Sequence, residues 1–234
     1  MPTIAENLSS VRATLPAGAT LVAVSKYHTA QAIAEAYAAG QRHFGESRVQ
    51  ELRDKQAALP ADIAWHFIGH LQPNKVKYIA PYVALVHAVD TPKLLAEIHR
   101  QAEKCGRRIP CLLQLHVAAE ETKYGFSLAK CEAFLQSGEW RNYPCAHIVG
   151  IMCMATNTDD EVRIESDFSR AHAFFLEARQ RFFADDTDFS VCSWGMSDDY
   201  QLALKHGSTH VRIGSRIFAT NYIYGRRKPV DSVR

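Results

Sequence analysis

The chain has 234 residues, of which 47% are hydrophobic and 22% are charged, and its formal net charge is +2. This length suits one α/β barrel domain with a complete core, so we expect residues 1–234 to form a single domain. The small net charge argues against a sequence-independent grip on nucleic acid, and the one basic cluster, residues 226–228, is typical of a solvated tail.

Targeting and redox signals are absent from the sequence. Residues 1–15 contain no apolar signal segment, and no run of 18 apolar residues occurs, so we expect a cytoplasmic protein. Six cysteines are present without a Cys-x-x-Cys pair, and several lie in apolar runs. We therefore expect reduced thiols and no disulfide framework or zinc site.

The predicted elements alternate between strand and helix after a first helix over residues 4–14. Short β-branched runs predict eight strands, at residues 21–25, 43–46, 65–70, 84–90, 110–117, 147–155, 189–194 and 210–214. Amphipathic stretches predict helices between them, at residues 29–39, 47–58, 73–79, 92–104, 127–136, 160–183 and 198–205. Gly40, Gly106, Gly138 and Gly207 lie where these helices should end.

This alternation indicates parallel strands joined by right-handed crossovers. Eight units favour a closed (β/α)8 TIM barrel, and a doubly wound open sheet is the competing architecture. In the barrel class the functional site lies at the carboxyl ends of the strands, so the residues that follow each strand are the candidates.

Lys26 directly follows the first predicted strand and should reach the barrel mouth. Low-dielectric surroundings disfavour an ammonium group, and a neutral amine is a nucleophile for carbonyl compounds. The alternative is a lysine whose stem lies along the barrel wall while its charge stays in water.

The loops after the last two strands have the composition of a phosphate site. Ser197 is a predicted N-cap of the helix at residues 198–205, and Gly214 and Ser215 offer accessible amides and a hydroxyl. These two loops often bind phosphate in barrels, although each alone is equally compatible with helix capping. Together with Lys26 they favour a phosphorylated aldehyde as the ligand.

Arg212 lies two residues before Gly214 on the last predicted strand. It is either paired with a carboxylate at the barrel floor or directed at the ligand. A guanidinium that donates to a pyridine nitrogen leaves that nitrogen unprotonated and weakens the ring as an electron sink. Lys123, in a loop after the fifth strand, is either a rim cation or a second amine for the aldehyde.

Other cofactor classes have no support in the sequence. The eleven histidines show no metal-binding spacing, and His66 and His70 lie four apart on a predicted strand instead of a helix. The dinucleotide and P-loop fingerprints are both absent.

Several segments, in this order and spacing, resemble one family over nearly the whole chain. They are LVAVSK (21–26), FGE (44–46), VQE (49–51), WHFIGHLQPNK (65–75), ETKYGF (121–126), GIM (150–152), GMSDD (195–199) and VRIGSRIF (211–218). The chain thus resembles the YggS/PROSC family of pyridoxal phosphate homeostasis proteins, whose fold is similar to the N-terminal barrel of alanine racemase.

The resemblance implies that pyridoxal 5'-phosphate forms a reversible Schiff base with Lys26. It also implies that Ser197, Gly214 and Ser215 hold the phosphate, with Arg212 near the ring, and Met196 belongs to the same segment as Ser197. Ser47 stands where the family has asparagine, so a shorter hydroxyl takes the place of an amide there.

Three functions remain open at this stage. The favoured one is a carrier without turnover, a monomer that stores the cofactor and passes it transiently to apo-enzymes. The second is a racemase-like enzyme, for which Tyr27, Tyr124 or Tyr222 would have to supply the second acid–base group, because the sequence shows no additional β domain. The third is a barrel that binds another phosphate ester without covalent attachment.

Overall fold

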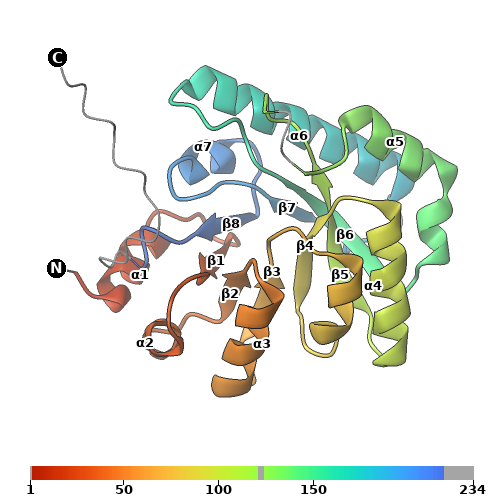
Figure 1. Cartoon of the computed structure of the whole chain (residues 1–234). Coiled ribbons are helices and arrows are strands. Elements are labelled where there is room, and N and C mark those ends of the chain that lie inside the picture. The colour runs from red at the N-terminus through yellow and green to blue at the C-terminus, as the bar shows by residue number, and fades with distance from the viewer. Residues whose placement is uncertain (1, 121–123, 219–234) are drawn as a thin grey trace, which may run out of the picture.

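The computed structural model describes residues 2–120 and 124–218 and forms a closed barrel of eight parallel strands in sequence order (Figure 1). The strands are β1 Thr20–Val24, β2 His43–Glu46, β3 Ala64–Phe67, β4 Leu85–Val89, β5 Ile109–Leu115, β6 Ala146–Cys153, β7 Val191–Ser193 and β8 His210–Ile213. β1 pairs with β8 over Thr20–Ala23, which closes the sheet and excludes the open alternative. The predicted barrel is confirmed.

Helices lie around the outside of the barrel (Figure 1). They are α1 Ile4–Arg12, α2 Ala30–Ala38, α3 Val49–Ala58, α4 Pro92–Lys104, α5 Leu128–Ser137, α6 Glu161–Phe182 and α7 Tyr200–Lys205, with 3-10 helices η1 Pro73–Tyr78 and η2 Glu139–Asn142. The sequence predicted an ordinary helix at η1 and nothing at η2, because periodicity does not distinguish such short turns.

Several helix boundaries follow from capping side chains. Thr29, Thr91 and Ser127 each accept a hydrogen bond from the amide three residues later. Thr3 and Glu6 form a reciprocal capping box at the start of α1. Gly40 has φ 86°, the left-handed conformation that ends α2.

The main apolar core lies between the barrel and its helices. Helix α4 buries Leu94, Leu95 and Ile98 completely, and α6 buries Phe168 and Ala171 in the same way. Each large side chain buried in this manner stabilises the fold by about 1.5–3 kcal/mol. A smaller cluster forms a separate part of the core: Leu85, Ala88, Leu112, Val149 and Met152.

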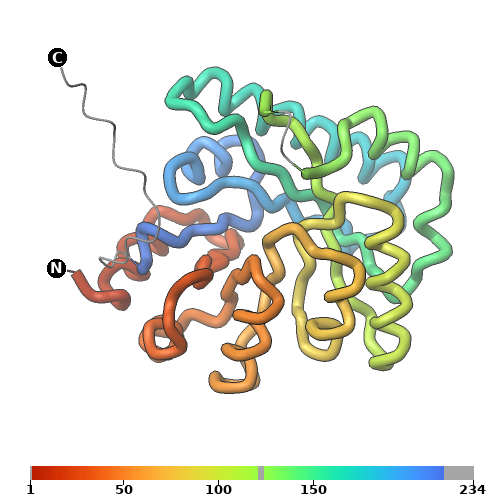
Figure 2. Tube along the Cα trace, in the orientation of Figure 1, coloured from red at the N-terminus to blue at the C-terminus, as the bar shows by residue number. Residues whose placement is uncertain are grey.

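Helix α1 contacts both the segment that follows β8 and the end of α2. Figure 2 shows α1, in red, beside the blue segment that follows β8. The Asn7 side-chain amide donates to the Ile217 carbonyl at 3.0 Å, and Arg12 donates to the Ala39 carbonyl beyond α2. Helix α1 therefore packs across the point where the barrel closes.

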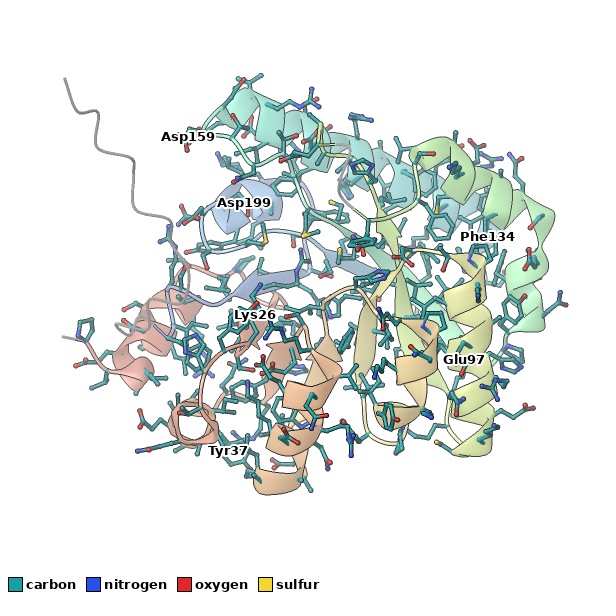
Figure 3. The ribbon with its side chains drawn as sticks, viewed as in Figure 1. Lys26, Tyr37, Glu97, Phe134, Asp159 and Asp199 are labelled. Carbon is teal, nitrogen blue, oxygen red and sulfur yellow. The ribbon has the colours of Figure 1, made fainter. Side chains whose placement is uncertain are left out.

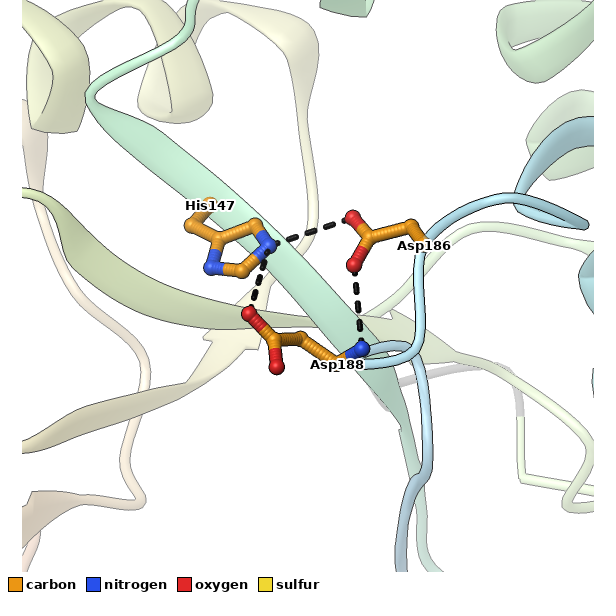
Figure 4. Close-up of side chains that lie close together, drawn as sticks. All are labelled: His147, Asp186 and Asp188. Atoms are coloured by element: carbon orange, nitrogen blue, oxygen red, sulfur yellow. Dashed lines mark hydrogen bonds and ion pairs between the residues drawn. The ribbon is translucent and has the colours of Figure 1, made fainter.

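One polar cluster lies at the amino end of β6 (Figure 4). His147 Nε2 is 3.2 Å from Asp186 Oδ2 and 3.8 Å from Asp188 Oδ2, and the Asp188 amide donates to Asp186. These contacts tie the connection between α6 and β7 to the start of β6.

The described residues contain no helix that is both long and apolar enough to cross a membrane. All six cysteines are free thiols, as the sequence predicted.

Two histidines, His66 and His87, are buried inside the barrel, and a third, His210, is partly buried beside them. Burial holds the pKa of His66 and of His87 well below the ordinary value, and it lowers the pKa of His210 to about 4. These imidazoles are therefore neutral in the folded protein at neutral pH.

Mild acid should therefore destabilise the fold. A folded-state pKa below the unfolded value means that the unfolded chain binds more protons, so stability is lost as pH falls below about 6.5. Each imidazole should cost about 1.4 kcal/mol per pH unit in the free energy of unfolding. Denaturant unfolding between pH 7 and pH 5 measures this slope, which should be shallower in His210→Asn. A flat profile in the parent protein would contradict the prediction.

Candidate cofactor site

A cavity of about 380 Å³ opens at the carboxyl ends of the strands. All seven residues singled out from the sequence line it, together with Gln114 of β5 and residues that directly follow β3 and β6. The seven are Lys26, Ser47, Met196, Ser197, Arg212, Gly214 and Ser215. Figure 3 shows Lys26 at the end of β1, on the same side of the barrel as Asp199. The structure thus brings the predicted residues together at one place.

Lys26 lies in the tight turn between β1 and α2. The preceding residue, Ser25, is fully buried and its amide donates to Gly45 on β2, whereas Lys26 itself is exposed. Tyr27 adopts φ 68°, a left-handed conformation that side chains other than glycine rarely take. Such a conformation persists only where the surroundings enforce it.

A buried ion-pair cluster enforces this turn, and we call Ser25, Glu46, Glu51 and Lys55 the Lys55 cluster. The ammonium of Lys55 donates to Glu46 Oε1 at 2.7 Å and to the Ser25 carbonyl at 2.8 Å, and it lies 3.3 Å from Glu51. The Ser25 hydroxyl donates to Glu46 Oε1 at 2.6 Å, and Glu51 accepts from the Tyr27 amide at 2.9 Å. The cluster therefore holds the residue on each side of Lys26.

Removal of one charged member of the Lys55 cluster would destabilise the fold. Glu46 is fully buried, and its Oε2 has no hydrogen-bond partner among the described residues. Burial raises the pKa of the Glu46 carboxyl, while Lys55 and Ser25 act in the opposite direction. Removing the ammonium would leave the buried carboxyl without its ion-pair partner, with only the Ser25 hydroxyl as donor.

The loops after β7 and β8 are joined by hydrogen bonds. The Gly214 amide donates to the Ser197 hydroxyl at 3.3 Å, and the Arg216 guanidinium donates to the Ser197 carbonyl. Within the described part of the chain, the amides of Ser197 and Ser215 donate to no protein acceptor. Two amides and the Ser215 hydroxyl thus remain free at the cavity for an anionic ligand.

The predicted cap of the last helix is wrong. Helix α7 begins at Tyr200, and its N-cap position is Asp199, which makes no side-chain capping bond. Asp199 instead accepts from the Met196 amide at 2.5 Å, which tightens the loop and leaves Ser197 free to bond Gly214.

Arg212 lies beneath the cavity with only 4% of its surface exposed. Its guanidinium donates to the carbonyl of Ser193 at 2.8 Å, to the Ser193 hydroxyl at 2.7 Å and to the Cys153 carbonyl at 3.0 Å. No carboxylate of residues 2–120 or 124–218 forms an ion pair with Arg212. The alternative prediction, that Arg212 pairs with a carboxylate at the barrel floor, is therefore wrong. Burial lowers the pKa of Arg212, but a guanidinium stays protonated in proteins.

Gly69 allows the wall of the cavity to form beside Ser47. A Cβ atom at Gly69 would lie 2.5 Å from the Ser47 carbonyl oxygen, so no larger residue fits there. Gln114, which the sequence analysis missed, also lines the cavity and donates to the Tyr124 carbonyl at 2.9 Å. In the sequence, the only sign of a role for Gln114 was that it is a polar residue within the apolar run of β5. Lys123 lies outside the described residues.

Comparison with known proteins places this barrel in a family. Residues 1–221 match the family described as "Alanine racemase, N-terminal domain", and the chain belongs to that family. It is similar to proteins named "Pyridoxal phosphate homeostasis protein". The Helicobacter pylori relative is 37% identical over 203 residues, covering 85% of this chain and 86% of the relative. The Escherichia coli K12 relative is 34% identical over 232 residues, covering 93% and 97%.

Solved structures agree with this assignment. PipY of Synechococcus elongatus, solved without PLP, has a TM-score of 0.86 and 37% identity, covering 92% of this chain and all of that chain. A second PipY structure, with PLP bound, has a TM-score of 0.83. Alanine racemase from Streptomyces coelicolor shares the fold at 18% identity and a TM-score of 0.73, covering 92% of this chain and 57% of the racemase.

The Lys55 cluster gives a testable prediction about stability. Lys55→Met should lower the free energy of unfolding by about 3–5 kcal/mol, because it leaves the buried Glu46 carboxyl without its ion-pair partner. The double variant Glu46→Met/Lys55→Met should recover most of that loss, since both charges are gone. Denaturant unfolding of both variants measures this difference, with Lys75→Met, at an exposed position, as the matched control. Equal losses in the Lys55 and Lys75 variants would contradict a structural role for the cluster.

Proposed function

We propose that this protein binds pyridoxal 5'-phosphate at the barrel mouth, attaches it reversibly to Lys26, and serves as a carrier that stores and delivers the cofactor. The observation that carries the proposal is the convergence on one cavity of a primary amine, a guanidinium and two free backbone amides. The names of the similar proteins, and the PLP in one PipY structure, support the same ligand.

The donor set fits this cofactor. Pyridoxal phosphate supplies an aldehyde that condenses reversibly with a primary amine, a phosphate and a pyridine ring. The Lys26 amine, exposed at the rim, can reach the aldehyde, and the amides of Ser197 and Ser215 can bind the phosphate. A cavity of about 380 Å³ is within the range of pockets that hold small ligands.

The remaining lining residues orient the ring in this proposal. Arg212 has only N–H groups, so toward a ring nitrogen it acts as a donor and supplies no acid proton. An unprotonated ring withdraws electrons weakly, which suits storage better than bond breaking at an amino acid. The side chains of Val24 and Met196 line the apolar part of the cavity, and Ser47 adds a hydroxyl.

Delivery follows from the exposure of the site. Lys26 and Ser215 are both exposed, so water or another amine can reach the attachment point. Transfer to the lysine of an apo-enzyme would proceed by exchange of one amine for another at the aldehyde carbon.

A racemase-like enzyme is the second candidate, and Tyr124 is the observation that favours it. Tyr124 lines the same cavity as Lys26, and its ring stacks on His70 with centroids 3.9 Å apart. A phenol and an amine on two sides of a bound substrate are the groups that a two-base racemisation requires. Incubation of the loaded protein with L-amino acids, followed by chiral chromatography, separates the two functions. Product of the opposite hand, lost in Tyr124→Phe, would establish the enzyme and displace the carrier.

Lys26 should carry the covalent bond. Borohydride reduction of the loaded protein, followed by peptide mass mapping, should place a pyridoxyl group on Lys26, because reduction makes the carbon–nitrogen bond permanent. Lys26→Ala should lose the tag, whereas Lys75→Ala, an exposed lysine outside the cavity, should retain it. A full tag on another lysine in the Lys26→Ala variant would move the attachment site.

Arg212 should affect the electronic state of the cofactor more than its attachment. In Arg212→Ala the ring loses its buried donor, so the absorption maximum of the bound cofactor should shift while the borohydride tag on Lys26 remains. Absorption spectra and mass mapping on one sample measure both effects. If the variant instead loses retention and keeps the spectrum, Arg212 contacts the phosphate and not the ring.

A further inference from the structure

A chain of hydrogen bonds runs through the barrel interior to Arg212. His43 Nδ1 lies 2.9 Å from His66 Nε2, and His66 Nδ1 lies 2.8 Å from His87 Nε2. His87 Nδ1 lies 2.9 Å from the Ser193 hydroxyl, which accepts from Arg212 at 2.7 Å. We call His43, His66, His87 and Ser193 the histidine relay.

The strand register explains why these residues meet. His66 on β3 pairs with Gly45, two residues beyond His43 on β2. His87 lies two residues beyond Leu85, the partner of His66 on β4. Each histidine is therefore one inward-facing position higher than the last, about 7 Å along the strand direction. The relay climbs from the amino end of β2 toward the cofactor cavity.

Arg212 favours one donor-to-acceptor order for the hydrogen bonds of the histidine relay. A guanidinium only donates, so the Ser193 hydroxyl accepts from Arg212 and has its own proton free for His87 Nδ1. His87, accepting at Nδ1, then donates from Nε2 to His66, and His66 donates from Nε2 to His43 in the same way. Neutral imidazole has one donor and one acceptor, so every bond is satisfied in this order.

The electrostatic surroundings keep the relay neutral. Burial, with His43 and His210 nearby, holds the pKa of His66 well below its ordinary value. Burial, with His66 and the guanidinium of Arg212 nearby, does the same to the pKa of His87. Burial also lowers the pKa of His43, but this residue is only half-buried. His43 is thus the point at which solvent protons enter.

We propose that the histidine relay positions Arg212 beneath the cofactor cavity and couples its hydrogen bonding to the protonation of His43 at the opposite end of the barrel. The part that concerns the cofactor rests on the proposed function, whereas the order of the relay does not. These are positioning residues, since none of the three histidines lines the cavity.

The coupling follows from the same donor count. A proton on His43 Nδ1 faces the N–H at His66 Nε2, so that bond is lost unless His66 changes tautomer. A reversed His66 opposes His87, and a reversed His87 directs an N–H at the Ser193 hydroxyl. That hydroxyl then accepts from both Arg212 and His87, and its own proton loses the acceptor that His87 Nδ1 provided. The groups that face His43 are His66 on β3 and His210 on β8, with Arg12 and Arg42 lining the recess beside it. None of these groups is acidic. Asp62 pairs with Arg42, and no carboxylate of the described residues forms a hydrogen bond or ion pair with His43.

The order of the relay can be measured without cofactor. Histidine ¹⁵N NMR of the cofactor-free protein, assigned with single His→Asn variants, reports the tautomer of each ring. We expect His66 and His87 as Nε2–H tautomers at neutral pH, and both should change with the same midpoint as His43 when the pH is lowered. In His43→Asn this joint change should disappear, whereas in His147→Asn, outside the relay, it should persist. An Nδ1–H tautomer at His87, or titration of His43 with no change at His66 and His87, would overturn the proposal.

The effect on Arg212 requires the loaded protein. Ser193→Ala removes one acceptor of Arg212 and the link to His87, so we expect a shifted absorption maximum and a dissociation constant about tenfold higher. The matched control is Ser208→Ala, a buried serine whose hydroxyl bonds Trp194 and lies outside the relay. Identical spectra and affinities in both variants would overturn the positioning role. Absence of any tag on Lys26 in the parent protein would instead refute the proposed function, while the NMR result would stand.

Discussion

The pairing of β1 with β8 is the constraint on which the site depends. Lys26 follows β1 and Gly214 follows β8, so these residues are 188 positions apart in the chain. Closure of the barrel sets Val22 opposite Arg212 and Ala23 opposite Ile213. In an open sheet the first and last strands would lie at opposite edges, and an amine and a phosphate loop would not share a cavity. The covalent and ionic parts of the proposed cofactor site are therefore products of closure.

Two buried polar networks then fix the two sides of that site. The Lys55 cluster lies outside the barrel wall and holds the turn that carries Lys26 through the Ser25 carbonyl and the Tyr27 amide. The histidine relay lies inside the wall and holds Arg212 through Ser193. Buried polar groups add little net stability compared with apolar packing of the same volume. What such networks contribute is a defined orientation, because their geometry is satisfied by few arrangements.

The sequence predicted most of the barrel and the residues at its mouth, because strand ends and loop glycines are local signals. Lys26 follows an apolar β-branched run, and the position of Gly214 after a strand is recognisable without knowing what lies opposite. Lys55 carried no such signal, since a lysine among charged helical residues normally faces solvent. His66 and His87 were likewise indistinguishable from core histidines until the register aligned them. The cap assigned to Ser197 failed because the amides of Asp199 and Tyr200 donate to the Met196 carbonyl, while the Ser197 hydroxyl accepts from Gly214.

The balance between carrier and enzyme depends on Arg212. A catalytic pyridine ring gains most of its electron-withdrawing power from a proton on its nitrogen, and a carboxylate partner stabilises that proton. Arg212 is a permanent donor, on which the Asp199 carboxylate acts electrostatically without forming an ion pair, and the relay beneath it is neutral. A protonated ring nitrogen would then face a positive charge in a low-dielectric interior, where like charges repel strongly. In the proposed function, the same interior that orders Arg212 therefore disfavours the ring state that decarboxylation requires, which agrees with reversible attachment at the exposed Lys26.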